Sequence, residues 1–191
     1  MPYRLEVRQI RKTYPGVVAL DDVSLGVNDG EVLAVIGENG AGKSTLMKIM
    51  AGIVEPDEGM ILLDERQVSF ANPSEAIRSG VSLIHQELNL HENLSVAENL
   101  FLGREPSRYG WLDRGEMFRR SEGYLEQVGL PIAPRTSLSQ LNTASRQLVE
   151  VAKAISTDAR VIIMDEPTSS LSIQETQRLF DVVGRLRRSG V

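Results

Sequence analysis

The spacing of apolar residues along the chain changes from strand-like to helical and back. Alternating apolar and polar positions, and short apolar runs bounded by turn residues, are typical of strands. The run at 32–36 is apolar throughout, as expected of a buried strand, whereas 5–10 and 17–27 alternate like strands of a partly exposed sheet. Strands are therefore predicted at 5–10, 17–27, 32–36, 60–63, 67–70, 81–84 and 161–164.

From about residue 88 to 151 the spacing of apolar residues becomes helical, with breakers such as Pro131 and Pro134 between the periodic stretches. Ser95 and Glu98 have the spacing of a capping box, with Val96, Leu100 and Phe101 following at helical intervals. The predicted helices begin with 44–50, which Gly52 ends, and continue with a short helix to Ser79 opened by Asn72, then 113–128, 145–156 and 173–188.

The segment Gly37-Glu38-Asn39-Gly40-Ala41-Gly42-Lys43-Ser44 follows the predicted strand at 32–36 and precedes a predicted helix. Its glycines let successive backbone N–H groups point inward at phosphate oxygens, and the helix adds the positive end of its dipole. Lys43 is expected to reach the β- and γ-phosphates, and the Ser44 hydroxyl to ligate Mg²⁺. A plain Gly-rich turn is the alternative, but this spacing in this context favours a phosphate-binding loop.

The run at 161–164 ends in two carboxylates, Asp165 and Glu166. A buried parallel strand delivers such groups to the carboxyl edge of a sheet, where ligands of open α/β sheets bind. Asp165 is expected to hold Mg²⁺, directly or through water, and Glu166 to orient or deprotonate an attacking water. Alone, this pair could equally be an exposed turn; beside the Gly-rich loop it indicates a nucleotide site.

Composition narrows the class of protein. The chain has 191 residues, 41% of them hydrophobic, which is enough for a domain with a real core. It has no cysteine, which excludes disulfides, thiolate metal sites and cysteine nucleophiles. A formal net charge of −5 gives no support for nucleic-acid binding. No apolar run approaches the roughly 18 residues of a membrane span, so we expect a cytoplasmic chain.

Taken in order, the Gly-rich loop, a Gln at a strand end, a helical insertion, the segment 141–147 and the segment 164–169 resemble the ATP-binding-cassette (ABC) ATPases over the whole chain. More narrowly, the chain is similar to sugar-importer ATPases that carry two cassettes in tandem. The sequence segments typical of that subgroup lie at 12–20, 85–90, 97–105 and 110–113.

The resemblance implies an α/β fold: a P-loop NTPase core with an N-terminal antiparallel β-subdomain and an inserted helical subdomain. The expected boundaries are 1–87 for the nucleotide-binding core with its β-subdomain, 88–151 for the helical subdomain with the signature segment, and 152–191 for the continued core. In the family the next strand ends in a switch histidine. Because the chain stops at Val191, we expect a C-terminally truncated, N-terminal cassette.

The resemblance also assigns roles to matching positions. Tyr14 would stack on adenine, and Gln86 would join the Mg²⁺ and water shell. The implied catalytic residues are Glu166, Lys43 and Gln86, and the implied metal ligands are Ser44, Gln86 and Asp165. The implied nucleotide-binding residues are Tyr14, Gly37, Glu38, Asn39, Gly40, Ala41, Gly42, Lys43, Ser44, Thr45, Asn142, Thr143 and Ala144.

Two segments depart from the family pattern. In the signature segment, Asn142 stands where Ser is expected, and Thr143 and Ala144 stand where glycines are common. Asn142 can still donate a hydrogen bond to an oxyanion, but this segment could instead merely cap the helix that follows. Ser172 stands where many cassettes have an Asp.

The implied function is ATP hydrolysis coupled to import of a carbohydrate, with ATP and Mg²⁺ bound. The implied partners are a second cassette, membrane permease subunits and, indirectly, a periplasmic sugar-binding protein, but no nucleic acid. The chain would then be peripheral on the inner face of the cell membrane. Two alternatives stay open: a soluble cassette ATPase of translation or DNA repair, and a nucleotide-binding remnant without activity.

Overall fold

A computed structural model describes residues 2–85, 89–169 and 171–191. The chain divides into two compact units, which we describe separately. The first unit contains residues 1–83, 159–165 and 185–191, and the second contains residues 84–158 and 166–184. The predicted boundaries at 87 and 151 stay predictions.

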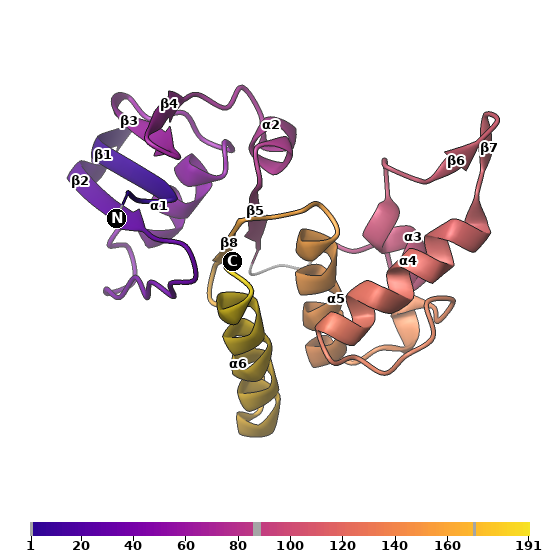
Figure 1. The fold of residues 1–191 in the computed structure, drawn as a ribbon. Coiled ribbons are helices and arrows are strands. Elements are labelled where there is room, and N and C mark those ends of the chain that lie inside the picture. The colour runs from indigo at the N-terminus through magenta and orange to yellow at the C-terminus, as the bar shows by residue number, and fades with distance from the viewer. Residues whose placement is uncertain (1, 86–88, 170) are drawn as a thin grey trace. The chain divides into compact units, whose positions relative to one another are not determined.

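An antiparallel sheet forms the first part of the first unit (Figure 1). Its four strands lie in the order β2-β1-β3-β4. The strands predicted at 5–10 and 17–27 are confirmed, but the first continues to Tyr14 through irregularities in register near Gln9, whose φ is 52°. The strand bounds are β1 Leu5–Tyr14, β2 Val17–Val27, β3 Glu58–Leu63 and β4 Arg66–Val68.

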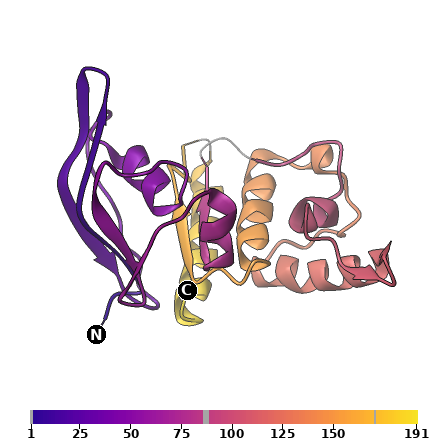
Figure 2. The ribbon, with the colours of Figure 1, turned by 90° about the horizontal axis from the view of Figure 1, so that it is seen from above.

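Helix α1 (Lys43–Met50) lies against one face of this sheet (Figure 2) and buries Leu46, Ile49 and Met50. These side chains belong to a core that also contains Val7 and Ile10 of β1. Two further strands, β5 (Val81–Ile84) and β8 (Val161–Met164), pair with each other and add apolar side chains to the same core. Helix α2 (Pro73–Arg78) begins after Asn72, whose side chain caps it as predicted.

The strand predicted at 32–36 is wrong. This segment is not part of any strand in the described structure, and Val32, Leu33 and Ile36 are 56%, 42% and 91% exposed. An apolar run becomes a buried parallel strand only where neighbouring strands pair with it and helices cover both faces. Among the described residues of this unit, the antiparallel sheet and the pair of β5 and β8 account for the paired strands, and neither includes this segment. Residues 32–36 therefore form a mostly exposed segment without regular secondary structure before the phosphate loop.

The second unit is helical, with α3 (Val96–Phe101), α4 (Arg114–Gln127), a 3-10 turn (Leu138–Gln140), α5 (Thr143–Ile155) and most of α6 (Ile173–Arg188). The predicted helices at 113–128 and 173–188 are confirmed, while α5 begins two residues earlier than predicted. The capping box of Ser95 and Glu98 is also confirmed. Asn99 is fully buried and bonds both the N–H and the carbonyl of His91, at 2.7 and 3.0 Å.

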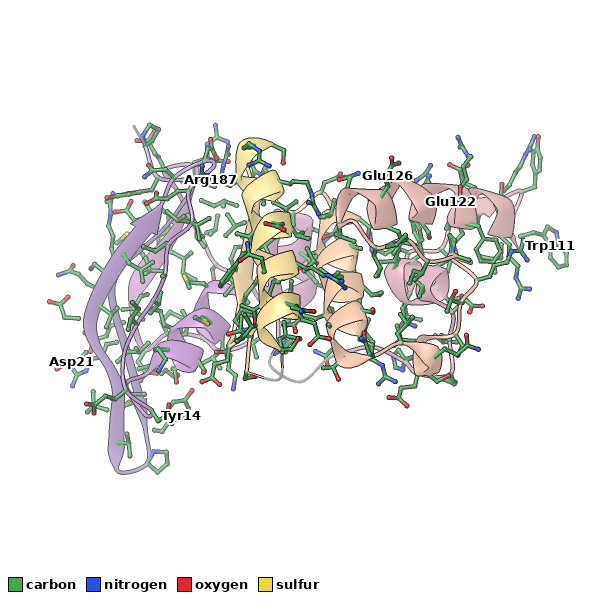
Figure 3. All side chains as sticks on the ribbon, turned by 90° about the horizontal axis from the view of Figure 1, so that it is seen from below. Tyr14, Asp21, Trp111, Glu122, Glu126 and Arg187 are labelled. Carbon is green, nitrogen blue, oxygen red and sulfur yellow. The ribbon has the colours of Figure 1, made fainter. Side chains whose placement is uncertain are left out.

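A two-stranded hairpin, which the sequence analysis did not predict, precedes α4. Its strands are β6 (Ser107–Arg108) and β7 (Trp111–Leu112), joined by Tyr109 and Gly110, which both have positive φ. Trp111, the only tryptophan, is 81% exposed, and its side chain points away from the ribbon (Figure 3). Among the described residues, no helix has the length and apolar character needed to cross a bilayer.

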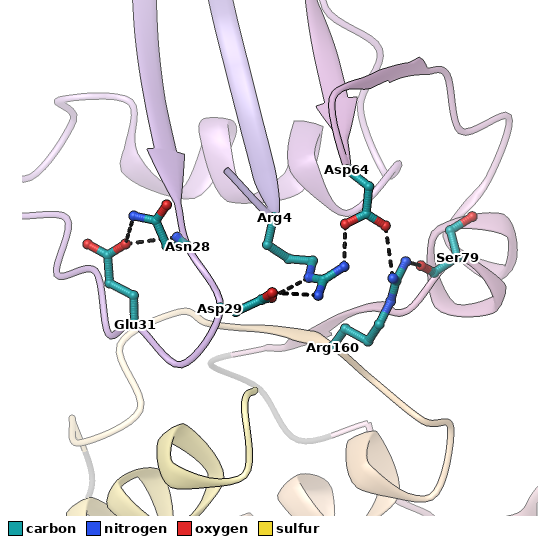
Figure 4. A network of polar contacts seen from close by, with 7 residues as sticks. All are labelled: Arg4, Asn28, Asp29, Glu31, Asp64, Ser79 and Arg160. Carbon is teal, nitrogen blue, oxygen red and sulfur yellow. Dashed lines mark hydrogen bonds and ion pairs between the residues drawn. The ribbon is translucent and has the colours of Figure 1, made fainter. Parts of the chain in front are cut away.

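An ionic network connects the antiparallel sheet to the strand that carries Asp165 (Figure 4). Asp64, after β3, accepts from Arg4 and, at 2.9 Å, from Arg160 at the start of β8. Arg4 also binds Asp29, and Arg160 donates to the Ser79 carbonyl at 3.2 Å. Burial opposes ionisation of Asp64, but its bond with Arg160 and the charges of both guanidinium groups hold its pKa below the ordinary value.

We expect Asp64→Asn to lower the free energy of unfolding at pH 7 by roughly 0.5–1 kcal/mol, a modest value because the pair is partly exposed. The folded-state pKa of Asp64 lies below its unfolded value, so its contribution is present above about pH 4. That contribution should shrink as the pH falls through the folded-state pKa. Urea unfolding followed by far-UV circular dichroism measures it at each pH.

The matched control is Asp21→Asn, because Asp21 is 76% exposed and 3.8 Å from its nearest guanidinium partner, Arg11. A loss for Asp64→Asn no larger than for this control, or one that does not change with pH, contradicts the proposed contribution of the network.

Candidate functional site

The Gly-rich loop encloses the ammonium group of Lys43. The Lys43 Nζ atom donates to the carbonyls of Gly37 and Glu38 at 2.8 and 2.9 Å. Gly40 and Gly42 take φ values of 83° and 88°, which let the chain turn back on itself between those carbonyls and α1. The loop therefore surrounds the positive charge of Lys43 with its own carbonyls, next to the N-terminal end of α1.

Gly42 is required for two physical reasons. It is the N-cap residue of α1 with left-handed backbone angles, which a side chain disfavours. In addition, a Cβ atom there would lie 2.3 Å from the carbonyl oxygen of Ala19 and 2.8 Å from Leu20 Cδ2. At Gly40, by contrast, a Cβ atom would meet nothing within 4 Å. Gly42 is therefore needed for packing against β2 as well as for its backbone conformation. Gly40 is needed only for its backbone conformation.

Two of the predicted metal ligands lie together. The Ser44 hydroxyl donates to Asp165 Oδ1 at 3.2 Å, which joins the start of α1 to the end of β8. A hydroxyl and a carboxylate are oxygen ligands of the kind that Mg²⁺ binds. The third predicted ligand, Gln86, lies outside the described residues. Within the described residues, no three His, Cys, Asp or Glu side chains group as a metal site.

Tyr14 lies at the end of β1 (labelled in Figure 3) and is 43% exposed, with Lys12 Nζ 5.8 Å from the centre of its ring. Asp57 fixes this end of the strand, since it accepts from Lys12 Nζ at 2.6 Å and from the Thr13 N–H at 2.7 Å. These bonds, the one with Lys12 first, hold the pKa of Asp57 far below its ordinary value. The ring is therefore presented at the surface by an anchored strand end.

Glu166 is an exposed residue with a φ of 47°, unusual for a residue other than glycine. Glu166 is the first residue of a turn, in which the Ser169 N–H donates to the Glu166 carbonyl at 3.2 Å. Glu166 and the segment 142–144 belong to the second unit, whereas the phosphate loop, Thr45 and Asp165 belong to the first. The structure thus brings the phosphate loop, Ser44 and Asp165 together within one unit.

Asn142 is the N-cap of α5. Its Oδ1 accepts from the Ser145 N–H at 2.9 Å, while Thr143 and Ala144 form the first turn of the helix. Asn142 and Thr143 are exposed. The side-chain oxygen of Asn142 is therefore engaged in capping, while its amide N–H₂ group has no hydrogen-bond partner among the described residues.

Two residues that hold the site segments, Asp57 and Gln147, are not among the residues that the sequence predicts for the site. Gln147 is buried and donates from Nε2 to the carbonyl of Pro167 at 2.6 Å. A polar residue on the buried face of a strongly amphipathic helix was the signal that could have identified Gln147.

Solved structures define the fold. A nucleotide-free ATP-binding cassette of an ABC transporter superposes with a TM-score of 0.88 at 28% identity, covering 100% of this chain and 79% of that one. The ADP conformation of the cassette MJ1267 gives 0.88 at 26% identity, with the same shares covered. The fold is that of an ABC ATPase core with an antiparallel N-terminal sheet and a helical subdomain, which confirms the predicted fold class.

The family model described as ABC transporter matches residues 20–169. The chain therefore belongs to the ABC transporter family, as its resemblance predicted. A putative ribose/galactose/methyl galactoside import ATP-binding protein of Agrobacterium fabrum is 51% identical over 183 residues, which are 95% of this chain and 36% of the relative. A ribose import ATP-binding protein of Rubrobacter xylanophilus is 51% identical over 187 residues, 98% of this chain and 38% of the relative. The chain thus spans little more than a third of these relatives.

We expect Gly42→Ala to lower the free energy of unfolding by about 2–5 kcal/mol, because it adds a backbone clash to the cost of positive φ. Gly40→Ala, the matched control, should cost only about 1–2 kcal/mol. Urea unfolding followed by far-UV circular dichroism compares them. Equal losses for the two variants would mean that the close approach of Gly42 to Ala19 is not a constraint in solution.

We expect Asn142→Ala to cost about 1 kcal/mol of stability through loss of the cap, and Asn142→Ser to stay within a few tenths of a kcal/mol of the parent chain. The same unfolding experiment measures both. If alanine is tolerated as well as serine, then the cap seen at the start of α5 contributes nothing.

Proposed function

We propose that the chain is the ATP-binding and ATP-hydrolysing subunit of an ABC importer that carries a carbohydrate. The observation that carries this proposal is the arrangement of Lys43, Ser44 and Asp165 at one end of α1. This arrangement supplies a cation that binds phosphate and two oxygen ligands for a divalent ion. Nucleoside triphosphatases use these groups to bind and hydrolyse their substrate.

The phosphate loop supports triphosphate binding through groups that are already oriented. The Lys43 ammonium now donates to two loop carbonyls, and phosphate oxygens can exchange for those acceptors without moving the charge far. Backbone N–H groups of residues 37–45 and the N-terminal end of α1 add further donors to the β- and γ-phosphates. Tyr14 offers its exposed ring to adenine, beside the charge of Lys12.

Ser44 and Asp165 fit a bound Mg²⁺, because both present oxygen atoms and these lie 3.2 Å apart. Gln86 is proposed as a further ligand. When bound, Mg²⁺ supplies neutralisation of the charge that develops on the phosphate oxygens. Asp165 would hold that ion while Glu166, the next residue in the chain, orients the attacking water and accepts its proton.

Hydrolysis by such a cassette requires a second copy or a partner cassette. Asn142, Thr143 and Ala144 are proposed to meet ATP bound to that partner, with the Asn142 amide as the donor. A structure of MJ0796 is described as a dimeric post-hydrolysis state bound to ADP and phosphate, and it shares the fold with a TM-score of 0.81 at 23% identity. ATP affinity would then be linked to closure of the two cassettes.

The names of the relatives, which are ATP-binding proteins of ribose or galactose import, support the remaining partners that we propose. We propose a membrane permease as the direct partner, which would hold the chain at the cytoplasmic face of the membrane. A periplasmic sugar-binding protein would act on the permease from the opposite side. The cargo is proposed as a carbohydrate of the class named in those relatives.

We expect Lys43→Ala to weaken Mg-ATP binding by about 100-fold, because two charge-assisted contacts to phosphate are lost. Lys48→Ala, on the exposed side of the same helix, should bind within about twofold of the parent chain. Isothermal titration calorimetry measures both. Normal binding by Lys43→Ala would refute the phosphate-loop assignment.

We expect Glu166→Gln to leave the Mg-ATP dissociation constant within about twofold and to lower hydrolysis by at least about 100-fold, since it removes the proton acceptor. Single-turnover hydrolysis at high chain concentration, where two copies can meet, gives the rate. Unchanged hydrolysis in this variant would exclude Glu166 as the group that activates water.

A further inference from the structure

Helix α5 holds the main chain of the segment that follows β8. Gln147 is only 7% exposed, and its Nε2 atom donates to the Pro167 carbonyl at 2.6 Å, a contact within the second unit. A buried amide is retained where its hydrogen bonds are made, because an unpaired one costs free energy. This bond therefore fixes the peptide plane that directly follows Pro167.

Glu166, the residue before this proline, has unusual backbone angles. Its φ of 47° is unfavourable for a residue with a Cβ atom, and such a conformation persists only where the surrounding structure restrains it. The turn bond from the Ser169 N–H to the Glu166 carbonyl, at 3.2 Å, is one restraint. The bond from Gln147 to Pro167 is the second, and it comes from a rigid helix rather than from the turn itself.

A second side chain of the same helix also binds a main-chain carbonyl. Lys153 donates from Nζ to the carbonyl of Asn89 at 3.1 Å. Gln147 and Lys153 lie six residues apart on α5. Both donate to carbonyls of segments that are neither helix nor strand, so the Gln147 contact is one of two by which α5 holds irregular main chain.

We propose that Gln147 is a positioning residue for Glu166. By holding the Pro167 carbonyl, its amide fixes the backbone of Glu166 and hence the direction in which the Glu166 carboxylate points. This inference rests on the water-activating role proposed above for Glu166. A misplacement of about 1 Å at a reacting group can cost about 100-fold in rate, so the effect should appear in hydrolysis rather than in ATP binding.

The first test needs no turnover. Gln147→Leu keeps the volume and burial of the side chain but removes the donor, and Val149→Ala, a cavity at a fully buried position of the same helix, is the matched control for lost stability. Hydrogen exchange of the Ser169 amide should speed up about tenfold in Gln147→Leu and stay near the parent value in Val149→Ala. Unchanged exchange in Gln147→Leu, or equal acceleration in both variants, overturns the proposal.

The second test places the effect in the reaction. Gln147→Leu should slow single-turnover hydrolysis by about 10–100-fold while the Mg-ATP dissociation constant stays within about twofold. In a Glu166→Gln background the same substitution should cause no further loss, because it acts through Glu166. A further loss in that background, or a parallel loss of ATP affinity, overturns the positioning role.

The two proposals fail in different ways. Normal hydrolysis by Glu166→Gln would refute the water-activating role of Glu166 and the positioning role that depends on it. Impaired Glu166→Gln beside an unaffected Gln147→Leu would refute the positioning role alone.

Discussion

Many main-chain carbonyls at helix ends and in irregular segments of this chain accept from long cationic or amide side chains. Irregular segments cannot pair their carbonyls in ladders, and a side-chain donor restrains the peptide plane that it binds. These pairs include Lys43 with Gly37 and Glu38, Arg104 with Leu100 and Ser156, Gln147 with Pro167, Lys153 with Asn89, and Arg160 with Ser79.

This constraint gives the functional segments their shape without making them part of a sheet. The segment from Gly37 to Lys43 curls back on itself, and the Lys43 ammonium binds two carbonyls of that segment. The same ammonium is the group that a phosphate attracts, so the bonds that shape the free loop are the ones a ligand replaces. The Lys43 ammonium therefore both stabilises the free loop and binds phosphate, so a change at this residue affects stability and binding together.

The sequence predicted elements whose signals are local. Helix α6 has the predicted bounds because its apolar stripe is continuous, and the helix after Asn72 begins where its cap and proline indicate. The Gly-rich loop and the carboxylates after β8 were recognisable because their spacing is tied to phosphate and metal chemistry. The order of the family motifs then predicted the fold class.

The failures concern features that depend on distant residues. Residues 32–36 are apolar like a strand but pair with no strand in the described part of the chain, and no local pattern could reveal that. The hairpin of β6 and β7 rests on only two residues a side. The sequence predicts Asn142 as a nucleotide-binding residue with helix capping as the alternative, and geometry was needed to show the cap. The partner of Gln147 is 20 residues away in the chain.

The exposed position of Trp111 has a practical consequence for folding experiments that use tryptophan fluorescence. Its indole is the only one in the chain and is 81% exposed at the turn of a small hairpin. Tryptophan emission depends on how much water surrounds the ring, and here water already surrounds it in the native state. Intrinsic fluorescence excited at the indole band will therefore change little when the nucleotide-binding core melts, and a flat signal from this chain is not a sign of stability.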